Sequence, residues 1–210
     1  GGGSSIPSAQ ARLKWNETEG TLDLGMGGGT ASLQLGQELY YPKVLNASGE
    51  DLINGTLVMV DPSNPAQGNR IRVVKSISDG TYDASKLIGV LTEPIIDNEE
   101  GFATWFGMVR DLNKTDLETE GLKYTGSAWA EGDTLYPDAT RPGGLTNIKP
   151  EAPNLKSSIA IIEKISGNDI QLLVRPQLGS NIENLNDVQI ATASHNDILV
   201  FSTSSNRFEN

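Results

Sequence analysis

Residues 157–176, SSIAIIEKISGNDIQLLVRP, hold two short apolar runs on either side of a Gly-Asn turn signal. Runs of this length, rich in β-branched residues and bounded by turn residues, are typical of β-strands. Similar runs recur along the chain at spacings of about 8–15 residues, and helical periodicity is nearly absent. The sequence therefore predicts an all-β fold, a small barrel or sandwich, with further strands at 56–60, 71–77, 86–91 and 102–109.

A pattern of three segments occurs twice in the middle of the chain. The segments follow one another in the same order in both copies, and each copy is bounded by turn residues. The matched pairs are Gly55-Thr56-Leu57 with Gly132-Asp133-Thr134-Leu135, residues 87–95 with 158–166, and residues 100–110 with 166–176, the last ending in Val109-Arg110 and Val174-Arg175. This repetition predicts a duplicated β-unit in which each copy buries its apolar face against the other.

The composition changes on both sides of the duplicated region, which spans residues 37–176. Residues 1–11 are rich in glycine and serine and are expected to form a flexible N-terminal arm. Residues 12–36 predict a β-hairpin that turns at Glu19-Gly20. Residues 177–210 are polar and poor in core residues, so we expect a fibre-shaft-like β segment that associates with copies of itself or continues past Asn210.

The stretch RPGGLTNIKPEAPN (141–154) holds three prolines and two adjacent glycines but lies inside the second copy of the pattern. The first copy has a connection of similar composition at the same place. We therefore interpret 141–154 as a connection within one β-unit, with a short strand in GLTNI, and not as a domain linker.

The net charge excludes several classes of partner. The 210 residues carry a net charge of −11, with no cysteine and one histidine. An acidic surface repels nucleic acid and anionic membranes, so neither is expected as a partner.

Without cysteine there is no disulfide frame, no thiolate zinc site and no thiol nucleophile. No stretch approaches the ~20 apolar residues that span a bilayer, and residues 1–12 lack the apolar core of a signal peptide.

The motifs that could carry catalysis are incomplete. His195 stands in a polar turn without the partners of a triad or a histidine metal site. GMGGGT (25–30) fits neither nucleotide-binding glycine pattern. DLNKTDLETEG (111–121) has Asp116 and Leu122 where an EF-hand needs glycine and glutamate, so an acidic loop is expected, with a looser cation site as the alternative. We predict no catalytic residue, no cofactor and no metal.

Two sugar-directed hypotheses remain as alternatives. Acidic residues such as Asp97 and Glu99-Glu100 could serve a glycosidase, although acidic neighbours are common in this chain. Exposed aromatic side chains could stack on a host-surface glycan. The candidates for such a platform are Trp105, Trp129 and Tyr136.

Several segments resemble virion structural proteins of tailed bacteriophages, of the tail-fibre, head-fibre and capsid-decoration types. They are LKWNETEGTLDLGM (13–26), LQLGQELYYPKVLNASGEDLINGTLVMV (33–60), LIGVLTEPI (87–95), TLYPDATRPGGLTNIKPEAPN (134–154) and VRPQLGSNIENLNDVQI (174–190). The resemblance also covers DILVFSTSSNRFEN (197–210), which is similar to modules that begin fibre shafts. It implies a non-enzymatic protein of the virion, a homotrimer in contact with other virion proteins, and leaves head and tail placement open.

Such a trimer needs apolar side chains around its threefold axis. The C-terminal segment offers candidates for this trimer interface: Leu185, Val188, Ile190, Ile198, Leu199 and Phe201. The leading hypothesis is thus a trimeric fibre or fibre anchor. The alternatives are a capsid decoration protein and, after that, a carbohydrate- or receptor-binding module.

Overall fold

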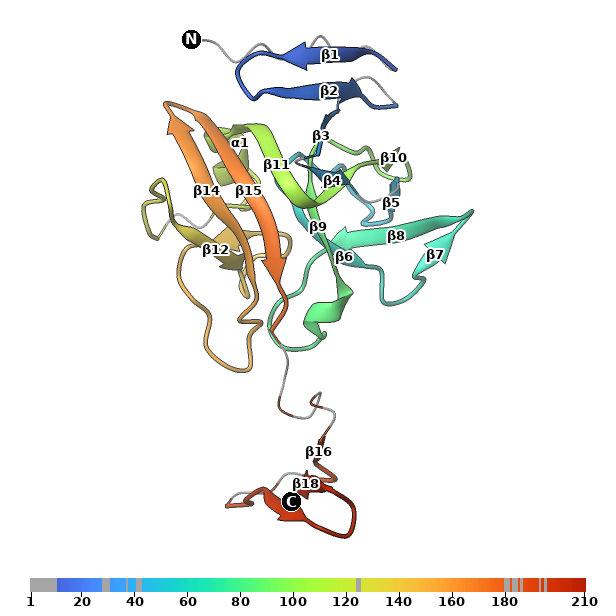
Figure 1. Cartoon of the computed structure of the whole chain (residues 1–210), viewed down its shortest axis with the longest axis vertical. Helices are drawn as coiled ribbons and strands as arrows, with labels where there is room; N and C mark the ends of the chain where they lie inside the picture. The colour runs from blue at the N-terminus through green and yellow to red at the C-terminus, as the bar shows by residue number, and fades with distance from the viewer. Residues whose placement is uncertain are drawn as a thin grey trace. The chain divides into compact units, whose positions relative to one another are not determined.

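The computed structural model describes residues 11–27, 31–36, 38–40, 43–123, 126–179, 182, 185, 187–192, 194 and 196–210. It divides into two compact units, residues 1–178 and 179–210 (Figure 1). Nearly all of the regular structure is β-strand, which confirms the predicted fold class. The exceptions are the 3-10 helix η1 (Ala84–Lys86) and the short helix α1 (Lys114–Thr119).

One large sheet forms the centre of the first unit. Its main path runs in the order β10-β5-β8-β6-β9-β11-β15-β14-β12-β13, with β4 beside β11 and β7 beside β8. The strands are β4 (Leu39–Tyr40), β5 (Val44–Asn46), β6 (Leu57–Val60), β7 (Ala66–Gln67), β8 (Arg70–Lys75), β9 (Leu87–Leu91), β10 (Glu100–Gly101), β11 (Ala103–Asn113), β12 (Thr134–Pro137), β13 (Leu145–Thr146), β14 (Ser158–Ser166) and β15 (Asp169–Gln177). Because the path ends at β10 and β13 in the described part of the chain, it does not close into a barrel and is consistent with a sandwich-like fold.

The repeated sequence pattern has a counterpart in this sheet. Strands β6, β9 and β11 form one group, β12, β14 and β15 form the other, and the antiparallel β11–β15 pair joins them. Gly55 donates its N–H to Leu91 O at 2.8 Å, as Gly132 does to Ile162 O at 2.8 Å. The return bonds, from Leu91 to Thr56 and from Ile162 to Asp133, are also equivalent.

The third segment of the pattern is matched in topology but not in register. Ala103 pairs with Leu91, and Leu172 pairs with Ile162, so Ala103 and Leu172 occupy equivalent places. The repeated sequence pattern instead matched Val109 with Val174, and this alignment differs from the structural register by four residues. A β-bulge between Val109 and Leu112 lengthens β11 without changing the strand order.

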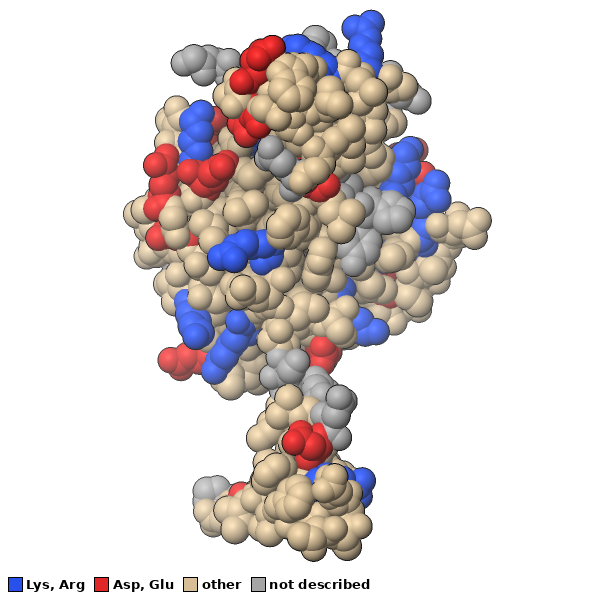
Figure 2. Space-filling view, viewed as in Figure 1, with Lys and Arg blue, Asp and Glu red and all other residues tan. Residues whose placement is uncertain are grey.

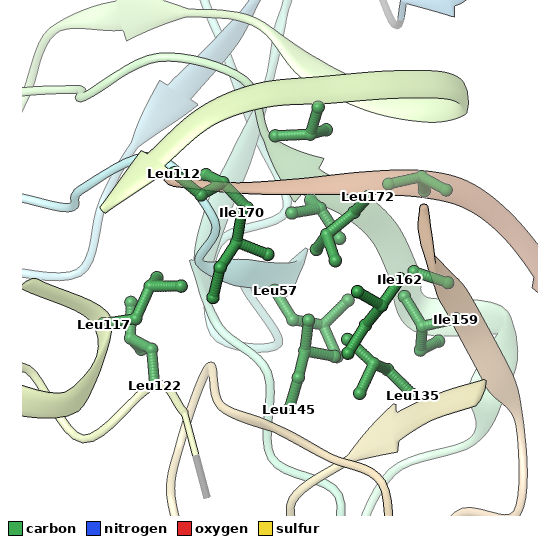
Figure 3. Packing of buried hydrophobic residues seen from close by; sticks show 14 of the residues in the cluster. Leu57, Leu112, Leu117, Leu122, Leu135, Leu145, Ile159, Ile162, Ile170 and Leu172 are labelled. Carbon is green, nitrogen blue, oxygen red and sulfur yellow. The ribbon is translucent and has the colours of Figure 1, made fainter. Parts of the chain in front are cut away.

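The main hydrophobic core lies between the two groups of strands. Leu57 from β6 packs with Leu135 from β12 and Leu172 from β15, as the close view shows (Figure 3). These three side chains are at most 1% exposed. A smaller core, half of it from the first group, contains Val44, Leu52, Val58, Val73, Ile88, Leu91, Ile95 and Ala103. Each copy of the pattern therefore supplies part of a shared interior.

Helix α1 occupies a stretch for which the sequence predicts an acidic loop. Asn113 caps it by accepting the N–H groups of Thr115 (2.9 Å) and Asp116 (3.2 Å). Leu117, 3% exposed, fixes the helix on the main core. Six residues are too few to show helical periodicity. In the sequence, the helix is indicated only by the capping residue Asn113 and the apolar residue Leu117.

The first unit also contains a separate N-terminal sheet. The hairpin predicted for residues 12–36 is present as β1 (Leu13–Asn16) and β2 (Thr21–Gly25), and β3 (Ser32–Leu35) adds a third strand. Residues 1–10 of the predicted arm lie outside the described residues. Within the described ranges, no helix has the length and apolar character that crossing a membrane requires.

Candidate functional site

The second unit is a small three-stranded sheet in the order β16-β18-β17, formed by β16 (Val188–Gln189), β17 (Val200–Ser202) and β18 (Arg207–Glu209). Val188 pairs with Phe208, and Phe208 pairs with Phe201, so the three side chains form one row on one face. The two phenylalanine rings meet edge to face, with centroids 5.3 Å apart and planes at 67°. We call Val188, Phe201 and Phe208 the C-terminal apolar row.

This sheet has no interior of its own. None of the described residues in 179–210 is a buried hydrophobic residue. Instead six of its described apolar side chains are open to solvent, from 38% for Phe208 to 74% for Ile198, while Val188 is half-buried. The other exposed members of the unit are Ile182, Leu185, Val200 and Phe201. Figure 2 shows the visible face of this unit as mostly uncharged. A small sheet with a bare apolar face is not expected to be stable alone.

Polar contacts hold the strands in place. Glu209 accepts hydrogen bonds from Ser205 Oγ (2.6 Å) and Arg207 Nε (2.8 Å), and these two bonds lower the pKa of its carboxyl. Asn210 Oδ1 accepts the N–H of Ala191 (3.0 Å), and Asn210 Nδ2 donates to Thr192 O (2.8 Å). These polar contacts stabilise the main chain that carries the exposed apolar side chains.

The structure brings together only part of the predicted trimer interface. Val188 and Phe201 share the C-terminal apolar row, whereas Leu185 and Ile198 are exposed outside the three strands. Ile190 and Leu199 are half-buried. Sequence reasoning missed Phe208, which lies at the centre of the row. The alternation of Arg207, Phe208 and Glu209 after a polar turn was the signal for that strand.

The acidic candidates for catalysis have structural partners. Asp97 accepts the N–H of Gly49 at 2.9 Å, and Glu100 pairs with Arg70 at 3.1 Å and Lys43 at 3.9 Å. Across the described ranges, no group of three or more His, Cys, Asp and Glu side chains is placed to hold a metal ion. His195 lies outside the described residues.

The aromatic candidates for a sugar platform do not form one. Trp129 is 9% exposed, and Lys123 Nζ covers its ring at 5.2 Å from the centroid. Trp105 is partly buried against the main core, and Tyr136 is half-buried in β12. A glycan platform needs aromatic faces open to solvent, so these residues do not support the carbohydrate-binding alternative.

A shallow depression of about 260 Å³ lies beside α1, lined by Asp111, Leu112, Asn113, Asn168 and Asp169. Its polar groups already serve the fold. Asn168 Nδ2 donates to Asn113 Oδ1 at 2.6 Å, and Thr115 donates to Asn168 Oδ1 at 3.2 Å. The depression therefore joins the start of α1 to the β14–β15 turn and offers few free polar groups to a ligand.

Comparison of the chain with known protein families, with curated proteins and with solved structures finds no match. The likeness to phage virion proteins thus rests on the sequence segments alone. The C-terminal apolar row, whose two phenylalanine side chains are 47% and 38% exposed, is the candidate functional site.

Proposed function

We propose that this chain is a non-enzymatic structural protein of a tailed-bacteriophage virion, which assembles as a homotrimeric fibre or fibre anchor attached to the particle. The observation that carries the proposal is the sheet of residues 188–209, whose apolar side chains have no core to enter. The resemblance of the sequence to phage fibre proteins supplies the setting, a virion in which identical chains stand side by side.

Association of copies through the C-terminal apolar row would complete the second unit. Burying a phenylalanine side chain is worth about 1.5–3 kcal/mol, so two such residues per chain can stabilise an assembly that the single chain cannot. Homo-oligomers usually close around a symmetry axis, and a threefold axis would bring three equal rows together. Val188, Phe201 and Phe208 would then line the axis, with Ile198 and Leu185 beside it.

The test measures the mass of the full chain in solution by sedimentation equilibrium. We expect a trimer for the natural sequence and a monomer for Phe201→Asp, because that change places a charge in the apolar contact and removes a buried ring. Phe106→Asp is the matched control, since Phe106 is 50% exposed in β11 and Phe201 is 47% exposed in β17. A trimer that survives both Phe201→Asp and deletion of residues 181–210 would refute this segment as the trimeriser.

Immunogold electron microscopy of the phage particles tests the placement. Label on the tail or neck would support a tail-fibre anchor, and label at sparse sites on the head would support a head fibre. Label over the whole capsid would favour the alternative, a capsid decoration protein. Particles without label would overturn the virion proposal, and a glycan array would then test the carbohydrate-binding alternative.

A further inference from the structure

The N-terminal sheet has its apolar side on the outside. Its two cross-strand rows are Leu13-Leu24-Leu33 and Trp15-Leu22-Leu35. Side chains directly opposite each other point to the same face, and the two rows lie two residues apart along each strand. All six residues therefore form a single face, which we call the outer leucine face.

Polar residues occupy the opposite face, which is buried on β2 and β3 and exposed at Lys14 of β1. Asp23 and Gln34 are 5% and 4% exposed, and the register pairs them directly. Arg110 of the central sheet donates to Gln34 Oε1 at 2.6 Å and to Glu38 Oε1 at 2.5 Å. Glu38 in turn accepts the N–H of Gln34 at 2.8 Å. These bonds hold the polar face against the central sheet, so the outer leucine face cannot turn inward.

Four of the six side chains of the outer leucine face are exposed, and Leu24 and Leu33 are half-buried. Leu13 and Trp15 are 62% and 51% exposed, and Leu22 and Leu35 are 39% and 38% exposed. The surface over β1 and β2 is mostly uncharged, with charged side chains along its margin (Figure 2). Four large apolar side chains exposed side by side on one sheet form a contiguous apolar patch, a feature that often marks an interaction site.

Residues 1–10, GGGSSIPSAQ, are poorly suited to cover this face. Their only large aliphatic side chain is Ile6, against six large apolar side chains on the sheet. Residues 1–10 therefore do not offer an apolar surface that matches this face.

We infer that the outer leucine faces of the three copies in the proposed trimer cover one another around the threefold axis. Interfaces between identical subunits are the more apolar class, whereas contacts with a different protein usually include charged or polar anchors. A chain with a net charge of −11 repels its own copies, and a face made only of leucine and tryptophan lets two copies meet without opposing like charges.

This inference rests on the proposed trimer. A stable contact usually buries about 800 Å² on each partner, more than a face of this size provides alone. Chains that the C-terminal segment already holds together meet at a high effective concentration, which lets a smaller contact form. Two contacts, one in each unit, would then act in the same assembly.

Site-specific cross-linking in the full chain tests the two contacts separately. The chain has no cysteine, so a single introduced thiol can react with a bis-maleimide that spans about 10 Å, the distance between packed sheets. Leu22→Cys and Leu35→Cys report on the outer leucine face, and Ile198→Cys reports on the C-terminal segment. Glu151→Cys, in an exposed loop of the first unit, is the control.

We expect Leu22→Cys and Leu35→Cys to give linked dimers roughly tenfold faster than Glu151→Cys, at a rate independent of protein concentration. If both link no faster than the control while Ile198→Cys links readily, the inference is overturned and the proposed trimer stands. If Ile198→Cys fails and the two leucine positions link, the C-terminal trimer is refuted and the outer leucine face is the contact. If no position exceeds the control, both are overturned.

Discussion

At the scale of single residues, close backbone approach decides which positions tolerate change. Gly89 lies in β9 with φ of +145°, and a Cβ added there would meet Thr104 O of the neighbouring strand at 2.4 Å. That oxygen belongs to the main chain of β11 and cannot rotate away. We expect Gly89→Ala to lower the free energy of unfolding by about 3 kcal/mol or more, measured by urea denaturation.

Gly132→Ala separates the cost of a steric clash from the cost of a positive φ. Gly132 also has a positive φ, +88°, but a Cβ there would meet no atom within 4 Å. We expect it to cost only about 1–2 kcal/mol, the price of placing alanine in the left-handed region. Equal losses for the two variants would contradict the close contact between β9 and β11.

Asp61 links the stability of the first unit to pH. Its carboxylate accepts hydrogen bonds from Ser63 N–H (2.9 Å) and Arg72 Nε (3.4 Å). Burial alone would raise the pKa of Asp61, but these bonds, with one from the Asn64 main chain, outweigh it and lower the pKa. A lowered pKa means that the charged form contributes stability above the unfolded-state value of about 4, and that the contribution is lost as the pH falls through the folded value.

Asp61→Asn should therefore destabilise the protein at pH 6, and its difference from the natural chain should shrink as the pH falls below about 4. Thermal unfolding of both proteins across this range measures the difference. A gap that stays constant from pH 6 to pH 3 would show that the charge of Asp61 does not contribute.

At the scale of elements, Arg110 connects the N-terminal sheet to the central sheet. The Glu38 side chain is fully buried and Arg110 is 28% exposed, so the pair is only partly screened by solvent. Arg110→Gln would remove the positive charge beside a buried carboxylate and should weaken the docking of β1–β3 by about 2 kcal/mol. Hydrogen exchange in β1–β3 should then be roughly 30-fold faster, with β14 and β15 unchanged.

The double variant Glu38→Gln with Arg110→Gln is the matched control. It removes both charges together, so no buried charge is left without Arg110, and we expect exchange in β1–β3 closer to that of the natural chain. If the double variant exchanges as fast as Arg110→Gln or faster, the ion pair is not what the single change disrupts.

The sequence predicted the positions of strands better than it predicted which of their side chains are buried. The runs at 157–165 and 169–176 match β14 and β15 to within one residue at each end, because β-branched residues between turn signals leave few other options. Alternation in β2 also shows that its two faces differ. It cannot show which face meets the rest of the protein, because that depends on Arg110, a residue far along the chain. The aromatic candidates failed for the same reason, since the burial of Trp129 is set by Lys123 and by the main core.

At the scale of the whole molecule, the two small sheets share one property that the central sheet lacks. Strands β6, β12 and β15 bury their leucines in a common core, whereas the N-terminal sheet exposes leucine and tryptophan and the C-terminal sheet exposes phenylalanine and valine. The central sheet has its core within one chain, and in the proposed trimer the two small sheets would gain most of their stability from neighbouring copies. This division suits a part that is assembled into a larger structure.

Salt should strengthen this assembly. Three copies, each with a charge of −11, would hold −33 together, and their repulsion extends over a Debye length of about 30 Å at 0.01 M salt but only about 8 Å at 0.15 M. The contacts proposed here are apolar, so added salt screens the repulsion and removes little attraction. We expect trimer formation to tighten roughly tenfold, about 1.4 kcal/mol, between these two salt concentrations.

Sedimentation equilibrium of the full chain at both concentrations measures the change. The control is Phe201→Asp, which we expect to stay monomeric at both concentrations. Association that weakens with salt would show that opposite charges hold the copies together, which would contradict contacts built from Phe201, Phe208 and the outer leucine face.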